Sequence, residues 1–127
     1  MDRLRNSGED KPPGTLQQYL EACLLLILRK GKCHGYELTK SLEAYGMGNK
    51  APGPVYRTLR KMEALGLIKS QWDTLSKRGS ARRVYNITSE GHAHLKKTAS
   101  ALHELVNTLS AFLKDVGIQE GDENSVS

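Results

Sequence analysis

Residues 50–88 decide the fold of this chain, and their sequence is KAPGPVYRTLRKMEALGLIKSQWDTLSKRGSARRVYNIT. A short Pro/Gly turn at residues 50–54 opens the segment, and a basic stretch at residues 55–65 follows it. Apolar residues recur in that stretch at the spacing of a helix, which Gly66 is expected to end. Four of them are predicted to face inward: Val55, Leu59, Met62 and Leu65. The remaining stripe is predicted to face largely outward and is mostly basic: Tyr56, Arg57, Arg60 and Lys61.

Pro54 suits the first position of this helix, where the N–H that proline lacks would have no partner anyway. Two alternating runs follow at residues 67–73 and 82–87, and both patterns predict short strands. Residues 74–81 join them and carry Lys77, Arg78 and Gly79. Helix, glycine, strand, basic hairpin, strand is the order of a winged helix-turn-helix. Such a module inserts a helix into the DNA major groove and lays a cationic hairpin on the flanking backbone.

Two further helices are predicted before this segment. Thr15 can cap the first one, which has apolar residues at three-and-four spacing and in excess of one face. We therefore expect that helix to be buried on two sides, and Gly31 to end it. The second helix is expected from His34 to about Tyr45, with His34 helping to start it. Its expected packing residues are Tyr36, Leu38, Leu42 and Tyr45.

A long helix is predicted after the strands, with Thr88 as its cap and Glu90 in its first turn. A seven-residue apolar repeat runs along it. Its members are Leu95, Ala99, Leu102, Val106, Leu109, Leu113 and Val116, and Leu105 and Phe112 thicken the stripe. Such a seam needs a partner, which is either a second copy of the chain or the first helix; both can hold.

The expected fold class is mainly α with a small β-hairpin. Four parts are expected along the chain: a flexible arm at 1–14, a winged helix-turn-helix at 15–88, a dimerisation helix at 89–116 and a disordered acidic tail at 117–127.

Charge points to a polyanionic partner. The chain has 127 residues, enough for one small domain, and a net charge of +5. Residues 50–97 hold eleven Lys or Arg and three Asp or Glu, whereas the last thirteen residues hold four acids and no base. The alternative explanation of the same charges is a basic surface that is simply exposed to solvent.

Other classes of protein are disfavoured. The longest apolar run, residues 22–28, is too short to span a membrane, and the first residues do not resemble a secretory signal. Two cysteines make no disulfide framework, so the cytoplasm is expected. The spacing of Cys33, His34, His92, His94 and His103 argues against a metal site. With no nucleophile–base pair or phosphate loop evident, neither enzyme activity nor a cofactor is expected.

Three motifs in order resemble those of PadR-like transcriptional regulators. They are residues 24–42 around His34-Gly35-Tyr36-Glu37-Leu38, residues 52–68 from Pro52-Gly53-Pro54-Val55-Tyr56 onward, and residues 83–91 from Arg83-Val84-Tyr85-Asn86 onward. The resemblance covers roughly residues 16–116. Residues 22–28 and 81–85 also look like those of the polyhydroxybutyrate-responsive repressor branch.

The resemblance implies a homodimer built by the first and last helices and bound to a pseudo-palindromic operator. Many such proteins repress and release DNA on meeting a small molecule. In some, planar drugs stack between tryptophans of the last helix. This chain departs from that pattern, because its single tryptophan, Trp72, lies in a predicted wing strand.

Aromatic and basic side chains of the predicted helix and wing are the candidate DNA-binding residues. Tyr56 and Arg57 are expected at groove edges or phosphates, and Arg60 and Lys61 at phosphates. Lys77 and Arg78 at the wing tip suit phosphate or minor-groove contact. The expected dimer interface comprises Leu20, Leu24, Leu102, Val106, Leu109 and Leu113. The binding site of a small apolar effector would be lined by Leu20, Leu24, Trp72, Leu102 and Val106. The alternative function is a winged-helix protein-interaction module that binds no operator.

Overall fold

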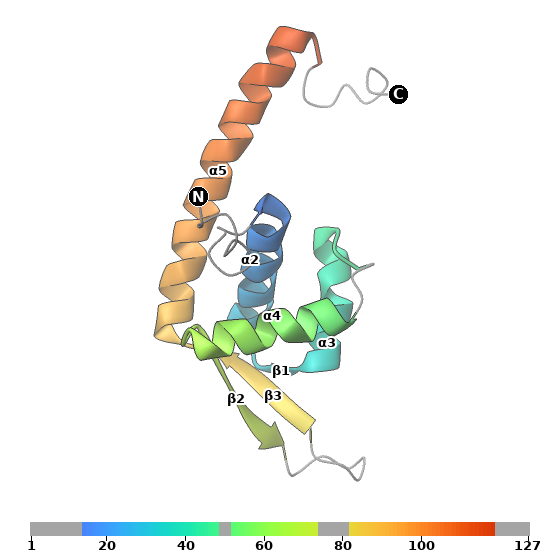
Figure 1. The fold of residues 1–127 in the computed structure, drawn as a ribbon, viewed down its shortest axis with the longest axis vertical. Helices are drawn as coiled ribbons and strands as arrows, with labels where there is room; N and C mark the ends of the chain where they lie inside the picture. The colour runs from blue at the N-terminus through green and yellow to red at the C-terminus, as the bar shows by residue number, and fades with distance from the viewer. Residues whose placement is uncertain (1–13, 49–51, 74–81, 119–127) are drawn as a thin grey trace, which may run out of the picture.

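The computed structural model of this protein describes residues 14–48, 52–73 and 82–118. Figure 1 shows the shorter helices grouped above a small sheet and a long last helix that extends beyond them. The expected mainly helical fold with a small sheet is confirmed. The predicted arm before residue 14, the tail after residue 118 and the wing-tip residues Lys77 and Arg78 lie outside the described residues. The elements in chain order are α2 (Thr15–Lys30), β1 (Cys33–His34), α3 (Gly35–Ser41), the 3₁₀ helix η2 (Leu42–Tyr45), α4 (Pro52–Ala64), β2 (Ile68–Asp73), β3 (Arg82–Ile87) and α5 (Ser89–Val116).

The sheet has three antiparallel strands in the order β1-β3-β2. Strands β2 and β3 form the predicted hairpin, with Ile68 opposite Ile87 at one end and Asp73 opposite Arg82 at the other. Strand β1 pairs with the far edge of β3 through Cys33 and His34. We did not expect β1, because two residues are too few to show alternation.

Helix α5 begins where the sequence predicted. The Thr88 hydroxyl accepts a hydrogen bond from the Gly91 N–H at 3.0 Å. The prediction for α2 was wrong, because Gly14 is its N-cap and Thr15 its first residue, with no side-chain cap. Helix α4 begins at Pro52 rather than Pro54. Both prolines fit, since the first four N–H groups of a helix have no intrahelical acceptor.

The second predicted helix is divided in two. Helix α3 ends at Ser41, the tighter η2 continues to Tyr45, and Gly46 then adopts a left-handed conformation with φ of 77°. His34 is the N-cap of α3, and its backbone N–H donates to the Glu37 carboxylate at 2.8 Å. The expectation that His34 helps to start this helix is therefore confirmed.

The core forms around α2, which packs against α5, α3, η2 and β3. Its burial on more than one side is confirmed, and a single chain supplies all of that burial. Two inward predictions were wrong. Leu65 is 62% exposed because α4 ends at Ala64, and Tyr36 is 47% exposed because its ring lies beside Arg82 rather than in the core. The largest fully buried side chains include Leu20, Leu24, Leu25, Leu28, Leu38, Leu42, Val55, Leu59 and Met62.

Candidate nucleic-acid interface

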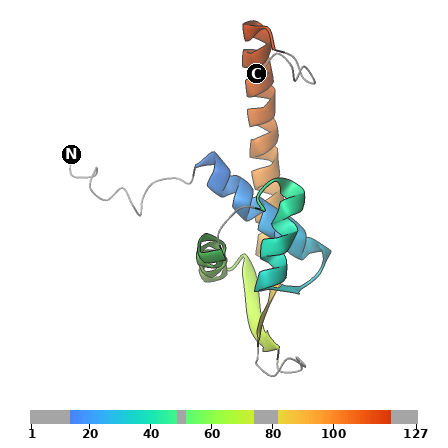
Figure 2. The same ribbon diagram turned by 90° about the vertical axis from the view of Figure 1, so that its right-hand side faces the viewer.

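The outer face of α4 carries two arginines. Val55, Leu59 and Met62 are fully buried, so the opposite face of the helix is turned toward solvent. Arg57 and Arg60 are both exposed on that face, three residues apart, as predicted. Guanidinium groups on an exposed helix are suited to guanine edges and phosphates. Figure 2 shows α4 end on, to one side of the hairpin.

Lys61 was predicted to bind DNA, but its contact in the structure is intramolecular. Its ammonium nitrogen lies 3.1 Å from the Glu21 carboxylate, whose side chain is only 9% exposed. The Gln17 amide donates to the same carboxylate at 3.1 Å and to the Thr58 hydroxyl at 3.2 Å. A buried carboxylate needs such partners. The cation of Lys61 therefore helps to join α4 to α2.

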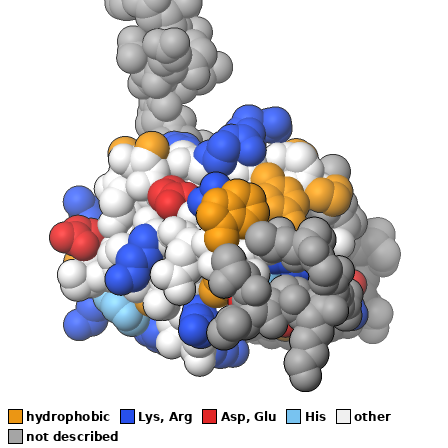
Figure 3. All heavy atoms as spheres, turned by 90° about the horizontal axis from the view of Figure 1, so that it is seen from below, with side chains coloured by type: hydrophobic (Ala, Val, Ile, Leu, Met, Phe, Trp, Pro, Cys, Tyr) orange, Lys and Arg blue, Asp and Glu red, His pale blue; other side chains and the backbone are white. Residues whose placement is uncertain are grey.

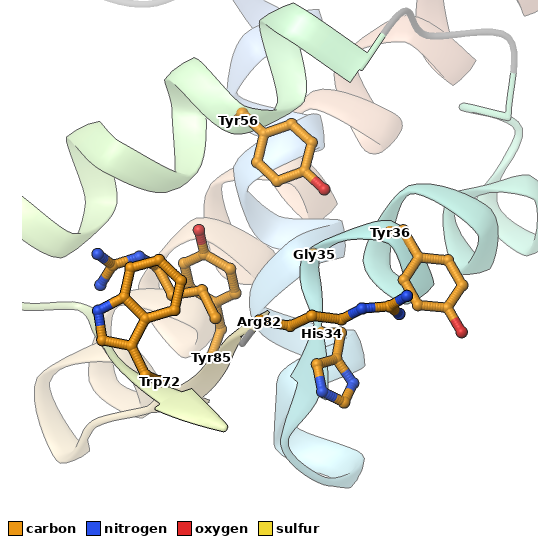
Figure 4. A pocket seen from close by; sticks show the side chains of 8 residues that line it. His34, Gly35, Tyr36, Tyr56, Trp72, Arg82 and Tyr85 are labelled. Carbon is orange, nitrogen blue, oxygen red and sulfur yellow. The ribbon is translucent and has the colours of Figure 1, made fainter. Parts of the chain in front are cut away.

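Tyr56 is half-buried and points from α4 toward the start of α3 (Figure 4). Its ring lies against Gly35, the first residue of α3: a Cβ at Gly35 would be 2.5 Å from Cε1 of Tyr56. Only glycine leaves room for the ring in this position. The side chain of Tyr56 is thus at the edge of the α4 face that carries Arg57 and Arg60.

Glu63 joins α4 to the wing. Its carboxylate accepts hydrogen bonds from the Ser70 N–H at 3.1 Å and from the Ser70 hydroxyl at 2.8 Å. Arg83 on β3 donates to the same hydroxyl oxygen at 2.9 Å. These bonds connect α4, β2 and β3 in one polar chain, so the helix and the hairpin are held relative to one another.

Two arginines on β3 stack on aromatic rings. The guanidinium carbon of Arg82 lies 5.2 Å from the ring centre of Tyr36, and that of Arg83 lies 4.4 Å from the ring centre of Trp72. Contacts at these distances are attractive and restrain the arginine side chain. Figure 3 shows the molecule from below, with Lys and Arg side chains around exposed hydrophobic ones.

These side chains surround a cavity between α4, the start of α3 and the hairpin, which we call the wing pocket (Figure 4). Its volume is about 410 Å³. Strands β2 and β3 supply one wall, and Tyr56 lies above them. Its lining includes His34, Tyr36, Tyr56, Trp72, Arg82 and Arg83.

His34 lies between two carboxylates beside this pocket. Its Nε2 is 3.0 Å from Asp73 and its Nδ1 is 3.2 Å from Glu37. The hydrogen bond from the His34 N–H is the main cause that lowers the pKa of Glu37, so this carboxyl stays ionised.

Burial raises the pKa of the Cys33 thiol to about 11, and the neutral thiol is a poor nucleophile.

Four residues of this region were not predicted from the sequence as site residues: Tyr36, Glu63, Arg82 and Arg83. The basic pair was visible as the first two residues of the second strand run, directly after the wing. Only the fold reveals that Tyr36 and Trp72, 36 positions apart in the sequence, lie beside that pair.

The residues predicted for the dimer interface and effector site are separated in the structure. Leu20 and Leu24 are 1% and 0% exposed and belong to the core of the single chain. Trp72 lies in the wing pocket, and Leu102 is half-buried against the core. Within the single chain the five predicted effector residues are thus divided among the core, the wing pocket and α5. The outer part of α5 carries a run of exposed apolar side chains: Val106, Leu109, Phe112, Leu113 and Val116.

A second cavity of about 660 Å³ lies between α2 and α5, with Leu26, Leu95, Ala99 and His103 among its lining residues.

Among the residues that the structure describes, no cluster of three His, Cys, Asp or Glu side chains is arranged to hold a metal ion. None of the described helices has the length and apolar character needed to cross a membrane.

A helical core, a helix with an exposed cationic face and a β-hairpin beside it define a winged-helix protein. Residues 24–97, more than half of the chain, match the sequence profile of the transcriptional regulator PadR-like family. The chain belongs to that family.

Solved structures and a curated relative are similar to the chain. A PadR family transcription regulator from Clostridium difficile superposes with a TM-score of 0.66 at 29% identity, over 75% of this chain and 98% of that one. A PadR-like transcriptional regulator from Bacillus cereus superposes with a TM-score of 0.65 at 29% identity, over 74% and 90%. Transcriptional regulator Rv3488 of Mycobacterium tuberculosis is 42% identical over 72 residues, which span 57% of this chain and 64% of the relative.

Proposed function

We propose that this protein is a sequence-specific DNA-binding repressor, which acts in the cytoplasm as a homodimer on a pseudo-palindromic operator. The observation that carries the proposal is the exposed Arg57–Arg60 face of α4, opposite a fully buried apolar stripe and beside a hairpin with further arginines. A helix of this kind can enter the major groove while the hairpin contacts the flanking backbone. The similar proteins are themselves described as transcriptional regulators.

Arg57 and Arg60 are the proposed readers of the groove. Three residues apart on one exposed face, they reach neighbouring positions along a groove. Tyr56 contributes its phenol at the edge of the same face. Lys77 and Arg78 are proposed to contact phosphate from the wing tip. We leave Lys61 out of this set, because its ammonium compensates the buried Glu21.

The outer half of α5 is the proposed dimer interface. Val106, Phe112 and Val116 are 57%, 61% and 59% exposed, and Figure 1 shows this half of α5 apart from the rest of the chain. An apolar stripe three turns long is unfavourable in water. A second copy packed along it would bury the stripe and relate two α4 helices by a two-fold axis. The half-sites would then be about 34–36 Å apart, or a multiple of that distance.

Release by a small apolar effector is also proposed. The cavity between α2 and α5 is the candidate place, since Leu26, Leu95 and Ala99 give it an apolar part next to the dimerisation helix. A ligand there would change the angle between α2 and α5. In the proposed dimer this would change the spacing of the two α4 helices.

The resemblance of residues 22–28 to polyhydroxybutyrate-responsive repressors has a second explanation in packing. Six of these seven residues are buried in the core of the single chain, so an apolar run is required there in any case. Binding of the purified protein to polyhydroxybutyrate granules, compared with bare lipid vesicles, tests membership of that branch.

Selection of genomic fragments by the purified protein, followed by footprinting, tests the function. We expect one or a few protected sequences with two-fold symmetry. Arg57→Gln and Arg60→Gln should each reduce the ratio of operator affinity to random-DNA affinity, at about 1–3 kcal/mol for a bidentate base contact. Selection that enriches no sequence, together with unchanged ratios in both variants, would favour the protein-interaction module instead.

A further inference from the structure

We infer that the wing pocket binds one phosphodiester group of the DNA backbone, beside the groove that α4 enters. The inference rests on the proposed DNA-binding function and adds a contact away from the Arg57–Arg60 face. What carries it is the juxtaposition of Arg82 and Arg83, each stacked on an aromatic ring, at the rim of one cavity.

The two arginines are held in place before any ligand arrives. Tyr36 from α3 lies under Arg82, and Trp72 from β2 lies under Arg83. Stacking covers one face of a guanidinium and leaves its N–H edge available to an anion. A restrained side chain also loses less conformational entropy when it binds. Arginines on loose surface stems would not have this advantage.

Arg83 keeps donors to spare. Its guanidinium has five N–H groups, of which one donates to the Ser70 hydroxyl at 2.9 Å. Ser70 is itself held by Glu63 of α4. The position of Arg83 is therefore fixed relative to α4, the helix proposed to enter the groove. This fixes the distance between a contact to the DNA backbone and the contacts to the bases.

The charge of the pocket favours an anion. The charged side chains of its described lining are Arg82 and Arg83, and it includes no Asp or Glu. The nearby carboxylates of Asp73 and Glu37 are in contact with His34 at 3.0 and 3.2 Å. Arginine forks match the oxygens of a phosphate, and phenols such as Tyr56 add donors. At about 410 Å³ the cavity is within the range of small-ligand sites, so a phosphodiester and its sugar can enter.

The first test replaces Arg82 and measures affinity for the selected operator and for random DNA at several salt concentrations. Arg82→Gln should weaken both DNAs alike and reduce the slope of log affinity against log salt by about 0.9 per subunit. Arg82→Lys keeps the charge and should restore the slope, which separates a lost contact from a lost fold. Lys97→Gln, an exposed change on α5, is the matched control and should leave the slope nearly unchanged. An Arg82→Gln slope equal to that of Lys97→Gln overturns the inference.

The second test locates the phosphate. Single neutral methylphosphonates are placed along one operator half-site, and one position should weaken the wild type but not Arg82→Gln. Trp72, the single tryptophan of the chain, lines the pocket and reports on its occupancy. Operator DNA should protect it from acrylamide quenching. Inorganic phosphate that gives the same protection without competing with DNA would identify a small-anion site and overturn the inference.

The two proposals fail in different ways. If the wild-type protein selects no DNA sequence, the proposed function fails. If it selects an operator that depends on Arg57 or Arg60, while no methylphosphonate position depends on Arg82, then the phosphate site alone is wrong.

Discussion

Gly91 lies where the first turn of α5 meets the turn that follows α4. The Leu67 carbonyl accepts the Thr88 N–H at 3.1 Å, and the Thr88 hydroxyl in turn accepts the Gly91 N–H at 3.0 Å. A Cβ at position 91 would collide with that carbonyl oxygen and come within 2.8 Å of the Ile87 side chain. Backbone atoms cannot move away as the end of a flexible side chain can. The junction of the domain with α5 therefore depends on the absence of a side chain.

Gly91→Ala should lower the free energy of unfolding by about 1–3 kcal/mol, the usual cost of overpacking. The sign is informative because alanine is favoured over glycine in a helix by about 1 kcal/mol. Urea unfolding followed by circular dichroism measures the change. Gly53→Ala is the control: it is also helical, and apart from its two chain neighbours a Cβ there meets nothing within 4 Å. The free energy of unfolding of Gly53→Ala should stay close to that of wild type, and a Gly91→Ala protein that is equally stable would contradict the packing.

Lys61 and Arg60 are adjacent cations with different expected roles. Lys61→Gln removes the charge 3.1 Å from buried Glu21 and should cost about 1–2 kcal/mol of stability, the order of a hydrogen bond to a charged group. The salt dependence of DNA binding should be unaffected. Arg60→Gln should leave stability nearly unchanged and reduce the salt dependence of DNA binding, since this exposed side chain is proposed to contact DNA. A reduced salt slope in Lys61→Gln, with stability unchanged, would return Lys61 to the DNA-binding set.

At the scale of elements, the first turn of α3 is stabilised by the charged carboxylate of Glu37. Glu37 accepts the His34 N–H at 2.8 Å, and its pKa is lowered chiefly by that bond. A carboxyl whose folded pKa lies below its unfolded value stabilises the protein above the unfolded pKa of about 4.3. That stabilisation is lost as the pH falls through the folded pKa.

Glu37→Gln keeps an acceptor oxygen and removes only the charge. Wild type should be more stable than this variant at pH 7, and the difference should shrink as the pH falls below about 4.5, because the unfolded state then binds the proton that Glu37 lacks when folded. Chemical unfolding at several pH values measures it. A difference that stays constant down to low pH would mean that the charge of Glu37 does not contribute.

The elements that periodicity could predict are those with long, regular patterns. The buried stripe of α4, the cap at Thr88 and the hairpin all follow from local spacing. Strand β1 could not be foreseen, because it exists only by pairing with β3, about 50 residues later. The same holds for the candidate site. Arg57 and Arg60 were visible as the outer face of a helix, whereas the stacking of Arg82 on Tyr36 and of Arg83 on Trp72 depends on tertiary contacts.

At the scale of the whole molecule, the two helices predicted to form the dimer interface differ in how far the single chain covers them. The first helix, predicted to be buried on two sides, is covered by α5, α3, η2 and β3 of the same chain. The outer half of α5 has no such cover among the described residues. The dimer interface is therefore proposed along Val106, Leu109, Phe112 and Val116, which the single chain leaves exposed.

Leu109 is the position that tests the dimer most cleanly. Leu102 is half-buried against the core of its own chain, so a charge there would also disturb folding. Leu109 is 49% exposed in the single chain, so Leu109→Asp should leave the monomer fold intact while placing a carboxylate in the apolar seam. We expect the mass from light scattering to fall from that of a dimer to that of a monomer, with unchanged circular dichroism.

Asn107→Asp introduces the same charge two residues earlier, on the opposite side of α5, and should remain dimeric. Because two α4 helices must reach two half-sites at once, the monomeric Leu109→Asp protein should also lose most of its preference for the full operator over an isolated half-site. A Leu109→Asp protein that remains a dimer would move the interface elsewhere. Equal loss of dimer in both variants would instead mean that added charge anywhere on α5 is enough, and that the seam has no special part in it.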